Sequence, residues 1–210
     1  MAAVFVDELE FGFGWIAPEP AFMRRCSHAF AVNGRAWIID PVEDDAALAR
    51  IEALGEPAGV IQLLDRHGRD CAHVAERLGV PRHVVPESAP DGACFDVVPL
   101  LHNRFWHEVA LWLPEQRTLV VADALGTAQY YRSSKERLAV SPVLRLTPPR
   151  RLLRYRPEHV LVGHGAGVHE DATEALHDAL EHARGQAVPW LWSGLRAHAP
   201  FRRRARSARR

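Results

Sequence analysis

Ionisable side chains crowd the end of one apolar segment, in the stretch LLDRHGRDC from Leu63 to Cys71. The residues before it, AGVIQLL at 58–64, form the short apolar run of a buried strand. The residues after it, RDCAHVAERLG at 69–79, have helical spacing and end on a glycine. Carboxylate, thiol and imidazole groups serve as metal ligands and as acid–base groups. The stretch is therefore a metal site, a catalytic site or a charged turn.

Two other predicted strands end in side chains of the same kind. TLVVAD at 118–123 ends on Asp123, and EHVLVGHG at 158–165 ends on His164 between two glycines. Functional sites are commonly built from the loops at the ends of strands, which a rigid sheet holds in place. Three strand ends that carry metal-type ligands predict one shared site.

The remaining pattern predicts strands early in the chain and a mixture of strands and helices later. Residues 29–40 read as two strands joined at Asn33-Gly34, a dipeptide that permits the positive φ angles of a tight hairpin. A helix is predicted at 44–54 behind an aspartate start, and a long helix at about 170–184. Residues 107–114 and 118–123 read as another hairpin.

Length and composition limit the classes of protein that are possible. The 210 residues, 48% of them hydrophobic, can form one domain, predicted at 1–190. No long uncharged apolar run or secretory leader is found, so a cytoplasmic protein without membrane contact is expected. Seven arginines lie from Arg196 to Arg210, and residues 191–210 are predicted to be a basic, disordered tail. Without a nucleic-acid motif, nucleic-acid binding is not expected.

The segments IIDP, LLDRHGRDC, EVALWLPEQRTLVVADALG and LVGHG resemble those of the metallo-β-lactamase superfamily, including its hydroxyacylglutathione-hydrolase-like and lactonase-like branches. The resemblance covers about residues 29–184. It implies an α/β fold, a four-layer αββα sandwich in which two mixed sheets face each other between outer helices.

The resemblance also implies a reduced metal site. The family motif T-H-x-H-x-D-H places Arg66 and Gly68 at its first two histidines, Asp70 at its aspartate and Cys71 at its last histidine. The family's next histidine ligand falls nearest Arg104, with His102 as a possible substitute. The bridging aspartate matches Asp123 and the G-H-G histidine matches His164. The ligand set that remains for one zinc ion is Asp70, Cys71, Asp123 and His164.

Two interpretations follow for the function. In the first, the chain is a mononuclear zinc hydrolase acting on an ester, thioester or lactone of a small molecule, with Arg66 and Asp70 as catalytic residues. In the second, no metal binds, Arg66 and Arg104 neutralise Asp70 and Asp123, and the protein is a non-catalytic pseudoenzyme with a binding or scaffold role.

Other polar residues are predicted to be structural. His67 is expected to be a solvated turn residue, Asp40 a structural turn carboxylate, and Cys26 and Cys94 inert thiols. The spatial expectation is that Asp70, Asp123 and His164 converge at one edge of the sandwich with Cys71 beside them.

Overall fold

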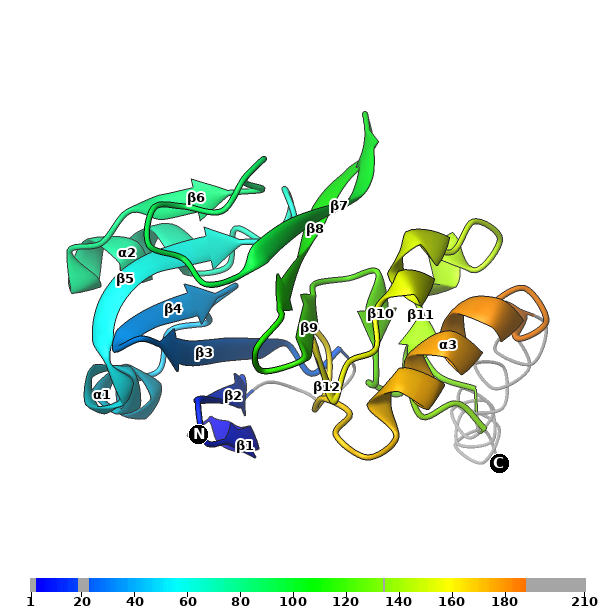
Figure 1. Ribbon diagram of the computed structural model, residues 1–210, viewed down its shortest axis with the longest axis horizontal. Coiled ribbons are helices and arrows are strands. Elements are labelled where there is room, and N and C mark those ends of the chain that lie inside the picture. The colour runs from blue at the N-terminus through cyan, green and yellow to red at the C-terminus, as the bar shows by residue number, and fades with distance from the viewer. Residues whose placement is uncertain (1–2, 19–22, 134, 188–210) are drawn as a thin grey trace, which may run out of the picture.

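The computed structural model describes residues 3–18, 23–133 and 135–187. The predicted basic tail at 191–210 lies outside the described residues. Two β-sheets occupy the middle of the molecule, with helices α1 and α2 on one side and α3 on the other (Figure 1). No helix in the described ranges is long and apolar enough to cross a membrane.

The first sheet has six strands in the spatial order of the chain, β1 to β6. They are β1 (Val4–Leu9), β2 (Gly12–Ile16), β3 (Cys26–Val32), β4 (Arg35–Ile39), β5 (Glu56–Gln62) and β6 (Arg82–Val84). The predicted hairpin is confirmed, because β3 and β4 pair antiparallel around Asn33 and Gly34, whose φ angles are 53° and 76°. The β4–β5 and β5–β6 pairs are parallel.

Parallel strands need a crossover connection, and helices provide both of them. Helix α1 (Asp45–Leu54) joins β4 to β5, and the Asp44 carboxylate caps its first turn by accepting a hydrogen bond from Ala47 N. Helix α2 (Cys71–Leu78) joins β5 to β6 and ends at Gly79 in the left-handed conformation. Both helices were predicted from the sequence pattern, and the structure confirms them.

The second sheet has four strands in the order β12, β9, β8, β7. They are β7 (Asp96–Asn103), β8 (Trp106–Leu113), β9 (Thr118–Val121) and β12 (His159–Val162). The predicted hairpin at 107–123 is β8–β9, while β12 runs parallel to β9. The smaller elements after β9 are β10 (Leu125–Gly126), β11 (Ala139–Val140), η1 (Pro142–Leu144), η2 (Arg150–Arg154) and α3 (Ala172–His182).

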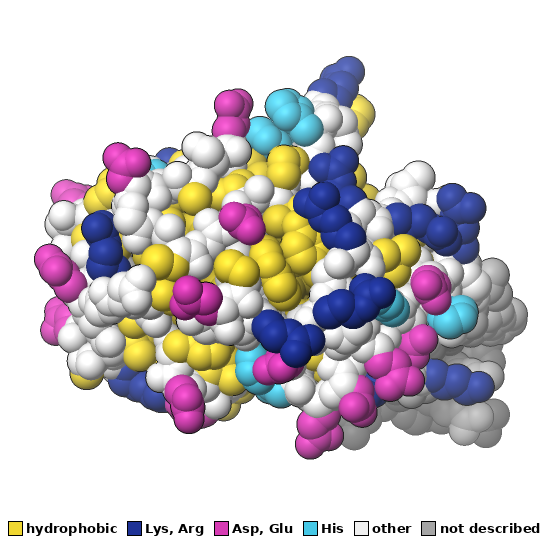
Figure 2. Space-filling view, in the orientation of Figure 1, with side chains coloured by type: hydrophobic (Ala, Val, Ile, Leu, Met, Phe, Trp, Pro, Cys, Tyr) yellow, Lys and Arg dark blue, Asp and Glu magenta, His cyan; other side chains and the backbone are white. Residues whose placement is uncertain are grey.

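Three apolar cores separate four layers, because neighbouring side chains on a strand point to opposite faces. On β4, Trp37 packs between the sheets, whereas Ile38 packs under α1 and α2. On β9, Val120 packs between the sheets, whereas Leu119 packs toward α3. Figure 2 shows hydrophobic side chains in the middle of one face, beside Lys and Arg side chains on the half nearer α3. The layers confirm the α/β αββα sandwich.

Candidate metal centre

Two neighbouring strands bring Asp123 and His164 to one edge of the second sheet. Strands β9 and β12 are parallel, with Val121 opposite Val162. Each candidate ligand lies two residues beyond its strand, so the two side chains emerge at the same level. His67 comes from the other sheet, in the loop between β5 and α2, and completes the group.

The three side chains converge on one carboxylate oxygen. Asp123 Oδ1 lies 2.9 Å from His67 Nε2 and 2.9 Å from His164 Nε2. One ligand atom from each residue lies within 4.8 Å of the other two. Both imidazoles are buried, while the Asp123 side chain is 21% exposed, so solvent reaches the group at the carboxylate.

The outer nitrogen of each imidazole is held by an acceptor. His67 Nδ1 lies 2.9 Å from Asp40 Oδ2, and His164 Nδ1 lies 2.9 Å from the Met23 carbonyl oxygen. A hydrogen on each Nδ1 satisfies these acceptors and leaves a lone pair on each Nε2 of the neutral ring. This arrangement is typical of histidines that bind metal, whose other nitrogen donates to a carboxylate or carbonyl.

The oxygen at the centre of the group supports the same interpretation. Within the described part of the chain, Asp123 Oδ1 is buried and receives no hydrogen bond of ordinary geometry, although both Nε2 atoms are close to it. A buried acceptor without a donor costs about 1–3 kcal/mol. A cation between these atoms would remove that cost, so the residues fit a metal ion.

The charges of the group are strongly coupled. Burial opposes ionisation of Asp123, but the adjacent imidazoles of His164 and His67 outweigh it and hold its pKa below the usual range. Burial and the Arg69 charge oppose protonation of His67, but Asp40 and Asp123 outweigh them and raise its pKa to about 9. The site therefore keeps a carboxylate and attracts positive charge.

His67 and Asp40 have larger roles than their sequence context indicates. The prediction that His67 is a solvated turn residue is wrong, because it is only 8% exposed and contacts two carboxylates. Asp40 does have the predicted structural role, since its Oδ1 accepts a hydrogen bond from Leu63 N, but its Oδ2 also orients His67. In the sequence, the IIDP segment contains Asp40 and the LLDRHGRDC stretch contains His67. These two segments were the signals that could have assigned both residues to the site.

Arg69 is a positioning residue that sequence reasoning missed. Its guanidinium donates to the carbonyl oxygens of Cys26 and Asp40 through one nitrogen and to that of Gly163 through the other. These carbonyls belong to the first residue of β3, the residue directly after β4 and the residue before His164. One side chain thus joins the two sheets directly behind the candidate site.

Glu108 and Tyr131 lie behind Asp123 and His164. Glu108 is fully buried on β8, and its two oxygens accept hydrogen bonds from Ala124 N and Trp106 Nε1. Tyr131 stacks on the His164 ring with centroids 5.7 Å apart. These contacts hold the loop after β9 against the neighbouring strands.

We expect Glu108 to make stability depend on pH in metal-free protein. Burial, with a smaller contribution from Asp123, raises its pKa to about 7 from an ordinary 4.5. A carboxyl with a raised folded-state pKa destabilises the fold as pH rises from below 4.5 through 7, by on the order of 3 kcal/mol. Urea unfolding in chelator at pH 5 and pH 8 should show this loss. Glu108→Gln should flatten the dependence, and an unchanged slope would contradict it.

The structure does not bring Asp70 and Cys71 into the group. Asp70 Oδ2 accepts a hydrogen bond from Glu43 N, so its carboxylate faces the loop before α1. Cys71 packs in the core beneath α2, and burial raises the pKa of its thiol to about 12. The predicted convergence is therefore wrong for these two residues, because the loop directs both side chains away from Asp123.

The two arginines assigned to the vacant histidine positions are exposed. Arg66 lies 3.8 Å from Asp65 Oδ1 and stacks over the Trp106 ring, and Arg104 stacks over Phe105. His102, the substitute ligand, stacks on His107 in the β7–β8 hairpin. The expected neutralisation of Asp123 by Arg66 and Arg104 is wrong, because His67 and His164 occupy that role.

Comparison of the structure with solved proteins identifies the fold. The metallo-β-lactamase DIM-1 aligns with a TM-score of 0.56 at 14% identity over 89% of this chain and 97% of its own. TMB-1 aligns with a TM-score of 0.56 at 13% identity over 89% and 97%. The metallo-β-lactamase from Pontibacter korlensis aligns with a TM-score of 0.60 at 11% identity over 85% and 99%. The chain therefore has the metallo-β-lactamase fold.

Comparisons of sequence add no closer relationship. No protein-family model matches the chain, and no curated protein sequence matches it.

Proposed function

We propose that this protein is a metal-dependent hydrolase with one zinc ion held by His67, Asp123 and His164. The observation that carries the proposal is the convergence of two oriented imidazoles on one carboxylate oxygen that lacks a hydrogen-bond donor. Two histidines and a carboxylate are a ligand set that catalytic zinc sites use, with a fourth position open to water or substrate. The solved neighbours named metallo-β-lactamases support the same class.

The bound ion would lower the pKa of a water molecule and polarise the substrate carbonyl. The chain's own residues prepare this chemistry. Asp40 and the Met23 carbonyl set the tautomers of the two imidazoles, and Arg69 fixes the strand ends behind them. The exposed part of Asp123 leaves an approach from solvent. An ester, thioester or lactone of a small molecule remains the proposed substrate class.

Arg66 is proposed to contact the substrate. It lies next to His67 in the chain, its side chain is 52% exposed and its guanidinium lies over Trp106, so it is available to hold an anionic group. The non-catalytic alternative, in which Arg66 and Arg104 replace the metal, loses its support because both side chains point to solvent.

Metal content and hydrolysis together test this proposal. His67→Ala and His164→Ala should each lose one equivalent of zinc relative to wild type, whereas Cys71→Ala and Asp70→Asn should keep it. Elemental analysis after purification without chelator gives the stoichiometry. Zinc-loaded wild type should hydrolyse members of a panel of esters, thioesters and lactones. Loss of a ligand should lower the rate of hydrolysis by more than the roughly 10- to 100-fold that is typical when a residue supporting a ligand is changed.

The outcomes are distinguishable. Unchanged zinc content in both histidine variants would overturn the metal site. Normal zinc content with no hydrolysis of any panel member would overturn the hydrolase. Arg66→Ala should raise KM for anionic substrates, with Arg104→Ala as the matched exposed arginine, and an equal effect of both would remove Arg66 from the site.

A further inference from the structure

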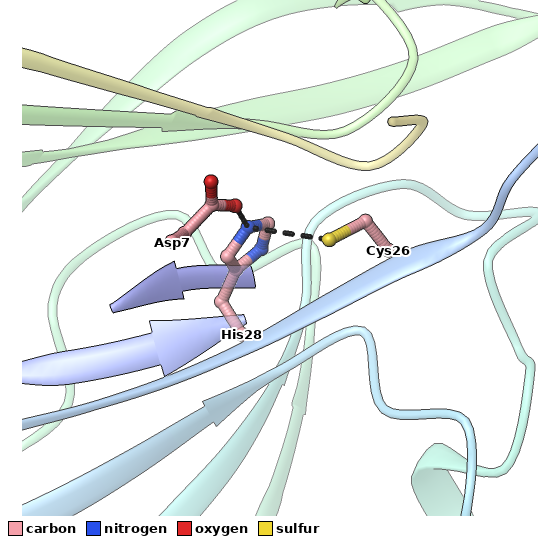
Figure 3. A group of neighbouring side chains, drawn as sticks. All are labelled: Asp7, Cys26 and His28. Carbon is pink, nitrogen blue, oxygen red and sulfur yellow. Dashed lines mark hydrogen bonds and ion pairs between the residues drawn. The ribbon is translucent and has the colours of Figure 1, made fainter. Parts of the chain in front are cut away.

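A second group of metal-type ligands lies in the first sheet, at Asp7, Cys26 and His28 (Figure 3). Cys26 and His28 are alternate residues of β3, so their side chains point to the same face. One ligand atom from each of the three residues lies within 4.8 Å of the other two, and all three residues are buried. This group shares no residue with the first.

Asp7 reaches the group through an irregularity in β1. The β1–β2 register shifts between Val6 and Leu9, and Asp7 has a φ of 54°, which redirects its side chain. Its Oδ1 accepts a hydrogen bond of 2.8 Å from Gly167 N and contacts His169 Nε2 at 3.0 Å. Its Oδ2 is directed at His28, as expected of a ligating carboxylate whose other oxygen is hydrogen-bonded.

A single nitrogen contacts both other ligands. His28 Nε2 lies 3.6 Å from Cys26 Sγ and 3.2 Å from Asp7 Oδ2 (Figure 3). A nucleophilic Cys-His-Asp triad would use two different imidazole nitrogens and an accessible thiol. Here one nitrogen is shared and Cys26 is 0% exposed, so the geometry excludes that chemistry.

The separations of His28 Nε2 from the other two ligand atoms fit a tetrahedral cation. Zinc lies about 2.3 Å from sulfur and about 2.0–2.1 Å from nitrogen or oxygen, which places S and N about 3.6 Å apart and N and O about 3.3 Å apart. Gly14 lies opposite His28 on β2. A Cβ on Gly14 would lie only 3.0 Å from Asp7 Oδ2 and 3.2 Å from His28 Nε2, so the glycine leaves an opening beside both ligand atoms.

We propose that Asp7, Cys26 and His28 form a second, structural site for a divalent transition-metal ion, with zinc as the expected occupant. Thiolate, imidazole and carboxylate together suit zinc, and three protein ligands leave the fourth position to water. The ion would join β1 to β3 and, through Asp7, to the segment after β12. Because the site is closed to substrate, its ion contributes stability and no chemistry.

Cobalt absorption tests this site separately from the first one. A thiolate bound to Co²⁺ gives a charge-transfer absorption in the near ultraviolet, and the His67–Asp123–His164 site contains no sulfur. The full chain has three cysteines, so Cys71→Ser with Cys94→Ser leaves Cys26 alone. Titrating this chelator-treated double variant with Co²⁺ should produce the absorption, which should saturate by two equivalents because the His67–Asp123–His164 site also takes up the ion, and should raise the melting temperature. Adding His164→Ala should leave the absorption unchanged.

Two further variants connect the absorption to the proposed geometry. Adding Cys26→Ser should abolish it, and adding Gly14→Ala should abolish it with the thiol still present. Gly185→Ala is the matched control, because a Cβ there meets its nearest neighbour at an ordinary 3.5 Å. A folded double variant that shows no near-ultraviolet absorption would overturn the site. Absorption that persists without Cys26 would also overturn it. The test on the double variant does not depend on whether the variant with Cys26→Ser folds.

Discussion

Asp40→Asn should lower the zinc affinity of the His67–Asp123–His164 site by about 10- to 100-fold while the protein remains folded. Asparagine can still accept the hydrogen bond from Leu63 N through its oxygen, and it tolerates the φ of 43° at this position. Its amide group would then face His67 Nδ1 as a donor. The imidazole must accept there, which moves its hydrogen to Nε2 and blocks the lone pair that binds the metal.

Competition with a chromophoric chelator measures the affinity, and ¹⁵N chemical shifts of labelled histidine report the tautomer. Asp70→Asn is the matched control, because that carboxylate accepts from Glu43 N and contacts neither imidazole of the site. Equal affinities for wild type and Asp40→Asn would show that Asp40 does not control His67.

Arg145→Met should destabilise the protein by about 3–5 kcal/mol. The Arg145 side chain is 1% exposed and that of Glu136 is 8% exposed, and the two form a bidentate pair at 2.8 and 2.9 Å. Arg145 also donates to the carbonyl oxygen of Tyr131, the residue that stacks on His164. Removing the guanidinium leaves a buried carboxylate without its counter-charge.

Urea unfolding of three variants distinguishes burial of charge from a general effect of losing an arginine. Adding Glu136→Gln to Arg145→Met should recover most of the loss, because glutamine carries no charge and can still accept from Ser133 N. Arg117→Met removes a pair with Glu158 in which both side chains are about half exposed, and should cost about 1 kcal/mol or less. Similar losses for Arg145→Met and Arg117→Met would contradict the account.

Local sequence signals were sufficient to predict most of the strands and helices that carry the candidate site. The Asn33-Gly34 pair, the Asp44 start and Gly79 each act within a few residues, so their hairpin, helix start and helix end follow from the chain alone. Asp123 and His164 were found in the same way, because each directly follows a short apolar strand. Strands were expected early in the chain, but none was assigned to residues 4–16, where β1 and β2 lie and where β1 supplies Asp7.

The first motif shows where spacing stops being informative. Matching LLDRHGRDC to a family pattern assigned Asp70 and Cys71 to the metal and left His67 in solvent, whereas the structure reverses both assignments. The direction of these side chains depends on the loop, in which Arg69 has a φ of 36° and donates to three carbonyls from distant strands. The spacing of residues in the sequence does not determine the conformation of this loop. It therefore cannot predict which of these side chains point toward Asp123.

The sequence by itself determined most of the strands and helices and two of the three residues at the candidate site, because strand periodicity and strand ends are local properties of the chain, while the expectation of four layers came from the resemblance to a family. Only the tertiary structure decided that His67 is the third residue and that Asp7 meets Cys26 and His28. Those contacts join residues 19 to 97 positions apart, and their geometry depends on how the two sheets and their loops pack.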